Sequence, residues 1–181
     1  MPDHVTVALD EAYIEFQTND DPDATVDLLA GFPNLVLLRT FSKVHGLAGL
    51  RCGYALCSPK FRAAVDAVRQ PFSVNELAQT AAAEAILHTD DAAQRVERTI
   101  AERIFVEEAL RELGLNPPDS EANFSWIPLG DRDEAEVIQS LGQAGIVVRG
   151  GEALGGPGHL RVTYGTHPEN QRFLDALAAA I

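Results

Sequence analysis

The sequence contains few of the residues that form disulfide networks or metal clusters. Its two cysteines, Cys52 and Cys57, are too few for a disulfide framework or a four-cysteine metal site. We expect both to pack as small side chains in a reduced, cytoplasmic compartment, and we expect no bound metal. No apolar run approaches the roughly 20 residues of a membrane span. The segment Met1–His4 does not resemble a secretory signal, so no membrane partner is expected.

Basic residues are also scarce. The chain has 14 Lys and Arg against 27 Asp and Glu in 181 residues, a net charge of −13. A surface of that sign repels phosphate backbones, which disfavours nucleic-acid binding. The glycines do not follow the dinucleotide-binding spacing, and neither a P-loop nor a nucleophile elbow is present. The hydrophobic fraction of 46% is nevertheless that of a folded domain.

Three short apolar runs in the first third of the chain predict strands of an α/β sheet. The first suits a buried parallel strand, and it starts so early that the chain reads as beginning in the middle of a fold. The second is followed closely by Lys43, and the third starts at Gly53. The three runs are 5–9, 35–38 and 53–56.

Capping patterns predict the helices that follow. Ser58 before Pro59 is typical of a helix start. Ser73 and Glu76 have the spacing of a capping box. The third helix is long, ends at Gly114 and looks like a connector between domains. The expected helices cover 58–68, 75–87 and 90–113.

The last third of the chain has a β-α-β-β-α order, which predicts a small α+β unit. Thr166 is placed to cap its closing helix. The expected strands cover 123–129, 146–149 and 159–164, and the expected helices cover 134–144 and 168–180.

Reactive side chains follow two of the predicted strands. Ligands gather at the carboxyl ends of strands in open parallel sheets. Asp10 ends the first strand, and Lys43 follows the second, where partial desolvation favours its neutral, nucleophilic form. Arg51 lies in a glycine-spaced turn where a guanidinium can bind phosphate. The hydroxyls of Thr40 and Ser42 would complete such a phosphate site.

These residues lie in motifs that resemble those of the fold-type I pyridoxal-phosphate-dependent aminotransferases. TFSKVHGLAGLRCGYAL (40–56) is similar to the family's cofactor-lysine signature, and DEAYIEF (10–16) to the strand end that precedes it. With PFSVN (71–75) and HLRVTYGT (159–166), the pattern looks most like the histidinol-phosphate aminotransferase branch. The motifs of the family's N-terminal half are missing, so the resemblance implies its C-terminal half.

The resemblance also implies a fold and a division into domains. The expected fold is α/β, with part of a three-layer α/β/α large domain and a small α+β C-terminal domain. Residues 1–70 would belong to the large, cofactor-binding domain, 71–114 to a helical connector and 115–181 to the small domain.

Pyridoxal 5'-phosphate is the cofactor that the resemblance implies. Lys43 would bond to it covalently and then move the substrate's α-proton. Asp10 would keep its pyridine nitrogen protonated, and Tyr13 would donate a hydrogen bond to its ring oxygen. The residues expected to bind its phosphate are Arg51, Ser42 and Thr40.

The resemblance implies an amino acid and a 2-oxo acid as substrates. Arg161 matches the arginine that binds the substrate α-carboxylate. Arg149 matches a position that meets the substrate phosphate in the histidinol-phosphate branch. Histidinol phosphate with 2-oxoglutarate is the leading substrate pair. A homodimer is expected, because the family's sites form between subunits.

Other functions stay open at this point. Within the lineage, an aromatic or phenylalanine aminotransferase is the nearest alternative, and a phosphothreonine decarboxylase has similar motifs. Outside it, the chain could be a non-catalytic aminotransferase-like fragment used for subunit association. An anion-binding module that uses only Arg149 and Arg161 would need no cofactor.

The candidate residues also have purely structural interpretations. Asp10 can cap the turn after its strand, and Arg51 can form a surface ion pair. Arg161 can face solvent from a strand, and Arg149 is evenly open between a substrate contact and a structural role. His45, two residues from Lys43, is expected to pack rather than to act chemically.

Overall fold

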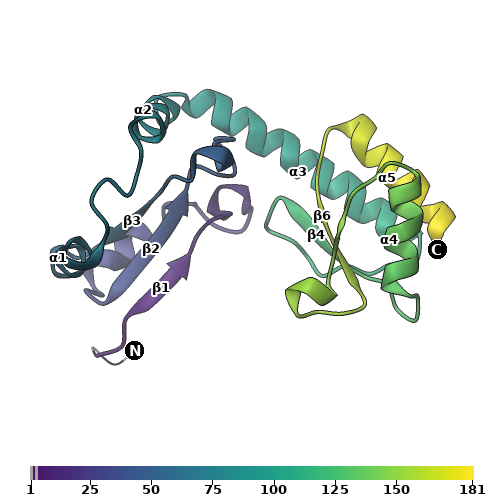
Figure 1. The fold of residues 1–181 in the computed structure, drawn as a ribbon, viewed down its shortest axis with the longest axis horizontal. Helices are drawn as coiled ribbons and strands as arrows, with labels where there is room; N and C mark the ends of the chain where they lie inside the picture. The colour runs from purple at the N-terminus through teal and green to yellow at the C-terminus, as the bar shows by residue number, and fades with distance from the viewer. Residues whose placement is uncertain (1, 3) are drawn as a thin grey trace. The chain divides into compact units, whose positions relative to one another are not determined.

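The computed structural model describes residue 2 and residues 4–181 and divides into two compact units. The units are Met1–Val96 and Glu97–Ile181, and the boundary falls within the long helix α3 (Thr89–Glu112). Each unit has its own three-stranded sheet (Figure 1). None of the helices among the described residues has the length and apolarity needed to cross a membrane. The division into three parts stays a prediction.

The sheet of the first unit combines a parallel and an antiparallel pair. β1 (Val7–Asp10) runs parallel to β2 (Leu35–Thr40), and β3 (Gly53–Cys57) runs antiparallel to β2. The order is therefore β1-β2-β3. All three predicted strands are confirmed. The central strand supplies the buried side chains Leu35, Val36 and Leu37.

The prediction that the first strand is buried is wrong, because β1 lies at an edge of the sheet. Its residues alternate between half-buried (Val7, Leu9) and exposed (Ala8, Asp10). An edge strand has a neighbour on one side only. The apolar run indicated a strand, but it carried no information about strand order.

α1 (Pro59–Val68) and α3 lie close to their predicted positions. Ser58 Oγ accepts a hydrogen bond from the backbone N–H of Phe61 at 3.3 Å. That bond satisfies one of the donors left free at a helix start. Three 3-10 turns complete the unit, at Ile14–Phe16, Val26–Ala30 and Ala48–Leu50.

The cap of α2 (Glu76–Ala85) differs from the predicted one. Asn75 Oδ1 accepts a hydrogen bond from the backbone N–H of Ala78 at 2.8 Å, so Asn75 is the N-cap. The capping box predicted for Ser73 with Glu76 is therefore wrong. Asparagine is as good a cap as serine, and here it is the residue next to the helix.

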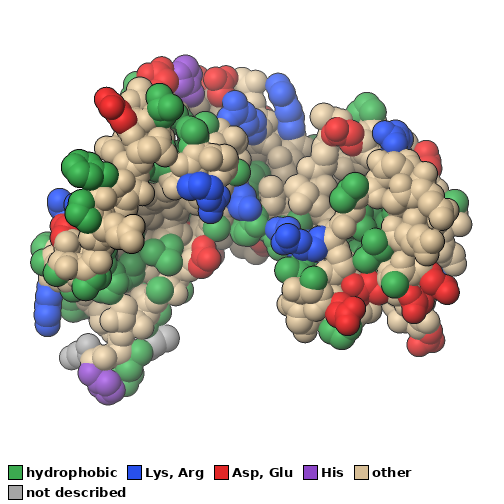
Figure 2. Space-filling model, in the orientation of Figure 1, with side chains coloured by type: hydrophobic (Ala, Val, Ile, Leu, Met, Phe, Trp, Pro, Cys, Tyr) green, Lys and Arg blue, Asp and Glu red, His purple; other side chains and the backbone are tan. Residues whose placement is uncertain are grey.

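Large apolar side chains are exposed along α1, α2 and the segment that connects them (Figure 2). Val68 is 83% exposed, Leu77 is 77% exposed and Phe72 is 96% exposed. Phe72 also has a φ of 58°, a conformation that bulky residues rarely adopt. Apolar surface of this kind is typical of contacts with other protein segments.

Arg39 forms a buried ion pair in the middle of the first unit. Its Nε lies 2.8 Å from Glu11 Oε2, and the two side chains are 9% and 5% exposed. Arg39 also donates to Asp23 Oδ1 at 2.7 Å and to the Pro22 carbonyl at 2.7 Å. Burial raises the pKa of the nearby Glu15. The charge of Arg39 lowers this pKa, and the charges of Glu11 and Asp23 raise it. Arg39 therefore joins β2 to two earlier segments of the chain, at Glu11 and at Pro22–Asp23.

The second unit has an antiparallel sheet covered by helices. Its strands are β4 (Phe124–Pro128), β5 (Arg149–Gly150) and β6 (His159–Thr163), in the order β4-β6-β5. α4 (Glu134–Gln143) and α5 (His167–Ala180) lie on one side of this sheet (Figure 1). The fully buried side chains of its core include Leu110, Ile127, Leu141, Leu160 and Leu177.

β5 is shorter than the predicted strand over 146–149. Only Arg149 and Gly150 pair with β6. Gly145, with a φ of 76°, ends the preceding helix, and the Ile146 N–H donates to the carbonyl of Leu141. The backbone N–H of Ile146 is thus bonded to the last turn of α4. Val147 is 96% exposed, so apolar character alone did not indicate a paired strand.

Glu134 anchors the connection between β5 and β6. Its Oε1 accepts a hydrogen bond from the backbone N–H of Glu152 at 3.1 Å, and its Oε2 accepts one from Gly158 at 2.7 Å. Gly156 packs against Trp126 so closely that a Cβ there would lie 2.6 Å from the indole. The connection is therefore held at several points.

We expect Glu134→Ala to loosen this connection without unfolding the unit. Hydrogen bonds to charged acceptors are worth about 1.5–3 kcal/mol each, so amide exchange at Glu152 and Gly158 should accelerate about tenfold or more. Hydrogen exchange measured by NMR tests this. The control is Glu136→Ala, in the same helical turn, which should leave both amides protected. Equal protection in Glu134→Ala would contradict the anchoring role.

Candidate functional site

The predicted cofactor residues of the first unit converge on one edge of its sheet. β1 and β2 are parallel and in register at Asp10 and Leu38, so their carboxyl ends share that edge. β3 is antiparallel and starts opposite Thr40, so the residues just before it lie at the same edge. The six predicted residues come from these three chain segments: Asp10, Tyr13, Thr40, Ser42, Lys43 and Arg51.

Lys43 and Tyr13 are brought together. Lys43 Nζ lies over the Tyr13 ring, 4.8 Å from its centroid, within the range of a cation–π contact. Both residues are half-buried. Asp10 is exposed, and its Oδ1 accepts a hydrogen bond from the Ala12 N–H at 3.1 Å, which fixes the turn leading to Tyr13. An amine, a phenol and a carboxylate thus belong to one sheet edge.

Thr40 and Ser42 form a hydrogen-bonded turn just before the lysine. The Thr40 hydroxyl accepts from the Ser42 N–H at 3.0 Å and lies 3.5 Å from the Cys52 carbonyl. Gly46, with a φ of 72°, donates its N–H to the Lys43 carbonyl at 2.9 Å. The backbone around Lys43 is therefore fixed by its own short-range hydrogen bonds.

Arg51 adopts a conformation unusual for a residue with a side chain. Its φ of 55° and ψ of 48° are left-handed, and it ends the 3-10 turn before β3. Its guanidinium donates to the Ala48 carbonyl at 2.9 Å. Strained backbone at a non-glycine residue is concentrated at functional positions, which agrees with the predicted phosphate-binding role.

His45 packs as expected. Its ring centroid lies 5.2 Å from that of Phe41, which is buried. Burial, and then the charge of Arg95, lower the pKa of His45. A lowered pKa keeps this imidazole neutral near pH 7.

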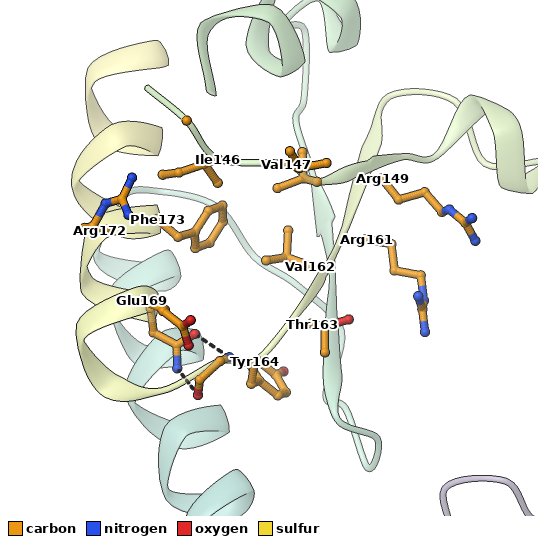
Figure 3. Close-up of a pocket in the computed structure, with 14 residues that line it drawn as sticks. Ile146, Val147, Arg149, Arg161, Val162, Thr163, Tyr164, Glu169, Arg172 and Phe173 are labelled. Carbon is orange, nitrogen blue, oxygen red and sulfur yellow. Dashed lines mark hydrogen bonds between the residues drawn. The ribbon is translucent and has the colours of Figure 1, made fainter. Parts of the chain in front are cut away.

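Arg149 and Arg161, in the second unit, lie directly opposite each other on β5 and β6. Figure 3 shows both side chains extending in the same direction, away from Phe173. Like charges directly opposite across a sheet repel, so this pair favours a bound anion. The predicted substrate residues are therefore brought together within their unit.

A cavity of about 620 Å³ adjoins the two arginines. Its wall combines apolar side chains with the hydrogen-bonded pair Gly165 and Asn170, in which each residue donates to the other. The wall also carries charged side chains, and a cavity lined by both apolar and polar groups is able to hold a small molecule. The lining residues include Val147, Val162, Phe173, Arg149 and Arg161. Among the described residues, no three His, Cys, Asp or Glu side chains form a group able to hold a metal ion.

Two features of these sites were not predicted from the sequence. The first is the ion pair of Arg39 with Glu11, which are the sequence neighbours of Thr40 and Asp10. An arginine within an otherwise apolar strand was the available signal. Phe124, on β4, lies against Arg161 with its ring centroid 4.0 Å from Cζ.

Comparison with known proteins identifies a family model that fits nearly the whole chain. The model, described as aminotransferase class I and II, matches residues 2–177. A histidinol-phosphate aminotransferase of Pseudomonas fluorescens Pf-5 is 44% identical over 181 residues, covering 100% of this chain and 49% of the relative. An aromatic amino acid aminotransferase of Mycobacteroides abscessus is 42% identical, covering 96% and 48%. The chain spans about half the length of the curated relatives it matches.

Solved structures give the same result for the fold. The histidinol-phosphate aminotransferase of Sinorhizobium meliloti, in complex with pyridoxal-5'-phosphate, has a TM-score of 0.85 and 28% identity, covering 99% of this chain and 50% of that one. The L-threonine-O-3-phosphate decarboxylase of Porphyromonas gingivalis has a TM-score of 0.86 and 26% identity, covering 98% and 55%. The predicted fold class is therefore confirmed, as part of the fold that these enzymes share.

Proposed function

Since the chain belongs to the aminotransferase class I and II family, we propose that it carries the reactive lysine and substrate arginines of a pyridoxal-phosphate-dependent aminotransferase. The proposed substrates are histidinol phosphate and 2-oxoglutarate. The observation that carries the proposal is the half-buried Lys43 amine, 4.8 Å from the Tyr13 ring centroid at a strand-end edge. Two histidinol-phosphate aminotransferases of Pseudomonas fluorescens are 44% and 45% identical to the chain.

The residues at this edge fit the cofactor chemically. Bound pyridoxal phosphate supplies an electron-accepting ring that stabilises negative charge on the substrate α-carbon. Asp10 offers a carboxylate to hold a proton on the ring nitrogen, and Tyr13 offers a hydroxyl to donate to the ring oxygen. Arg51 brings positive charge for the phosphate. Two hydroxyls, of Thr40 and Ser42, add further groups able to bind phosphate oxygens.

Lys43 then has two tasks in this proposal. Its amine would hold the cofactor covalently, and as a free amine it would take the proton from the substrate α-carbon. The contact with Tyr13 and the hydrogen bond from Gly46 to the Lys43 carbonyl support this, because both restrain the lysine. A restrained base spends less of its time in geometries unsuited to proton transfer.

Arg149 and Arg161 bind the anionic end of the substrate in this proposal. Their direct cross-strand pairing supports it, since two guanidinium groups on one face suit a dianion such as a phosphate monoester. The same pair would also accept the α-carboxylate of an amino acid. Binding there would orient the reacting bond.

An aromatic amino acid aminotransferase is the second candidate. It is favoured by the 42% identity of the Mycobacteroides abscessus relative, close to that of the histidinol-phosphate enzymes. We further infer a homodimer and a cytoplasmic location. The exposed Val68, Phe72 and Leu77 support the first, and the two free cysteines, Cys52 and Cys57, support the second.

Titration with pyridoxal phosphate tests the proposal. The chain has two lysines, Lys43 and Lys60, so attachment sites are simple to map. We expect a saturable visible absorption band that borohydride removes, and peptide mapping that finds the reduced adduct on Lys43. Adducts shared equally between Lys43, Lys60 and the terminal amine would contradict the proposal. Amino donors added to the loaded chain then report whether the bound cofactor turns over.

A further inference from the structure

One face of the second unit's sheet holds an aromatic and cationic array. In the register of β4 and β6, Trp126 lies opposite Arg161 and Phe124 opposite Thr163. Side chains alternate between the faces of a sheet, so these four share a face. The other face packs into the core through Ile127, Leu160 and Val162.

Within this array the Arg161 guanidinium lies over the ring of Phe124. Its Cζ is 4.0 Å from the Phe124 ring centroid, well inside the roughly 6 Å range of a cation–π contact. Trp126 is instead stacked on His159, with centroids 5.1 Å apart and ring planes 16° apart. Phe124 is thus the diagonal cross-strand neighbour that receives the cation.

The contact between Arg161 and Phe124 matters because the other strand beside β6 carries a second arginine. Arg149 lies directly across from Arg161 on β5 and repels it, whereas Phe124 lies on β4 and attracts it. The Phe124 ring covers one face of the Arg161 guanidinium, whose N–H groups point outward in the plane of the cation. The contact therefore restrains the plane in which Arg161 presents its hydrogen-bond donors.

We propose that Phe124 is a positioning residue that pre-orients Arg161 for anion binding. The proposal rests on the anion-binding role given to Arg161 in the proposed function. Arginine has many rotamers, and binding an anion must select one of them. A guanidinium already restrained by a ring loses less freedom on binding, and it therefore binds the anion more tightly.

The experiment follows the Arg161 side chain in the ¹⁵N-arginine-labelled chain. Its Nε–Hε signal is assigned with Arg161→Lys and titrated separately with inorganic phosphate and with 2-oxoglutarate. In Phe124→Leu we expect loss of the ring-induced shift of Hε and about two- to fivefold weaker binding of both anions. Phe124→Tyr keeps the ring and should bind within about twofold of the unchanged chain. The matched control is Phe105→Leu, whose ring contacts His167 instead.

Each outcome decides the proposal. Weaker binding in Phe124→Leu, unchanged binding in Phe105→Leu and recovery in Phe124→Tyr support it. Equal affinity in Phe124→Leu, with the Trp126 emission showing the unit folded, overturns it. An Arg161 signal that neither anion moves in the unchanged chain also overturns it. That last result leaves the cofactor site untouched, because the Lys43 adduct is measured separately in the first unit.

Discussion

Replacing Lys43 with alanine should abolish the saturable reaction of the chain with pyridoxal phosphate. The expected loss is complete at this position, since alanine has no amine and the reaction requires one. Phosphate contacts from Arg51 would remain but would hold the aldehyde only non-covalently. The measurement is the borohydride-reduced adduct, quantified by intact mass and by peptide mapping.

Lys60 provides the control for this prediction. It is exposed on α1, away from the Lys43 sheet edge, and it is the chain's other lysine. Lys60→Ala should leave the saturable band and its midpoint unchanged. If Lys43→Ala keeps the saturable band, the reactive group lies elsewhere and the proposed function loses its central observation.

Replacing Arg39 with methionine should destabilise the first unit by about 3–5 kcal/mol. That is the usual cost of leaving one charge of a buried pair without its partner. The carboxylate left behind is Glu11, whose side chain is 5% exposed and whose Oε1 already has no hydrogen-bond partner. Urea-dependent hydrogen exchange of the β2 amides measures the change within this unit.

The loss of stability that Arg39→Met causes in the first unit should grow as the pH rises. Burial raises the pKa of Glu15, while the charge of Arg39 lowers it, so removing Arg39 raises this pKa further. A folded state with a raised carboxyl pKa holds a proton that the unfolded chain releases. Stability is therefore lost as the pH rises above the ordinary value of about 4.5.

Two variants separate the buried pair from its surroundings. Arg39→Met combined with Glu11→Gln removes both charges and should recover a large part of the lost stability. Arg62→Met breaks an exposed pair with Asp66 in the same unit and should cause no measurable change. Equal losses in Arg39→Met and Arg62→Met would show that burial of the pair has no energetic role.

The positions of most helices and strands follow from local patterns in the sequence. Periodicity and caps such as Ser58 are properties of a few neighbouring residues, so one sequence suffices to read them. The edge position of β1 and the short pairing of β5 depend on partners distant in the chain. The spacing of Ser73 and Glu76 predicted the wrong cap for α2, because the helix starts directly after Asn75, whose side chain caps it.

The residues of the candidate site likewise fall into those that sequence patterns indicate and those that only the folded structure shows. Strand ends and motif spacing indicated Asp10, Lys43 and Arg51, because chain direction alone brings strand ends to one edge. The contact of Phe124 with Arg161 depends on cross-strand register, which no pattern in the sequence fixed. An aromatic residue on a predicted strand is more readily interpreted as core.

Trp126 is the only tryptophan of the chain. Its indole is stacked on the His159 ring and lies close to Gly156, and both of these residues belong to the second unit. The emission spectrum of the chain is therefore a reporter for that unit, without any added label. Circular dichroism reports on the helices of both units. Different midpoints for unfolding followed by tryptophan emission and by circular dichroism would show that the two units unfold independently.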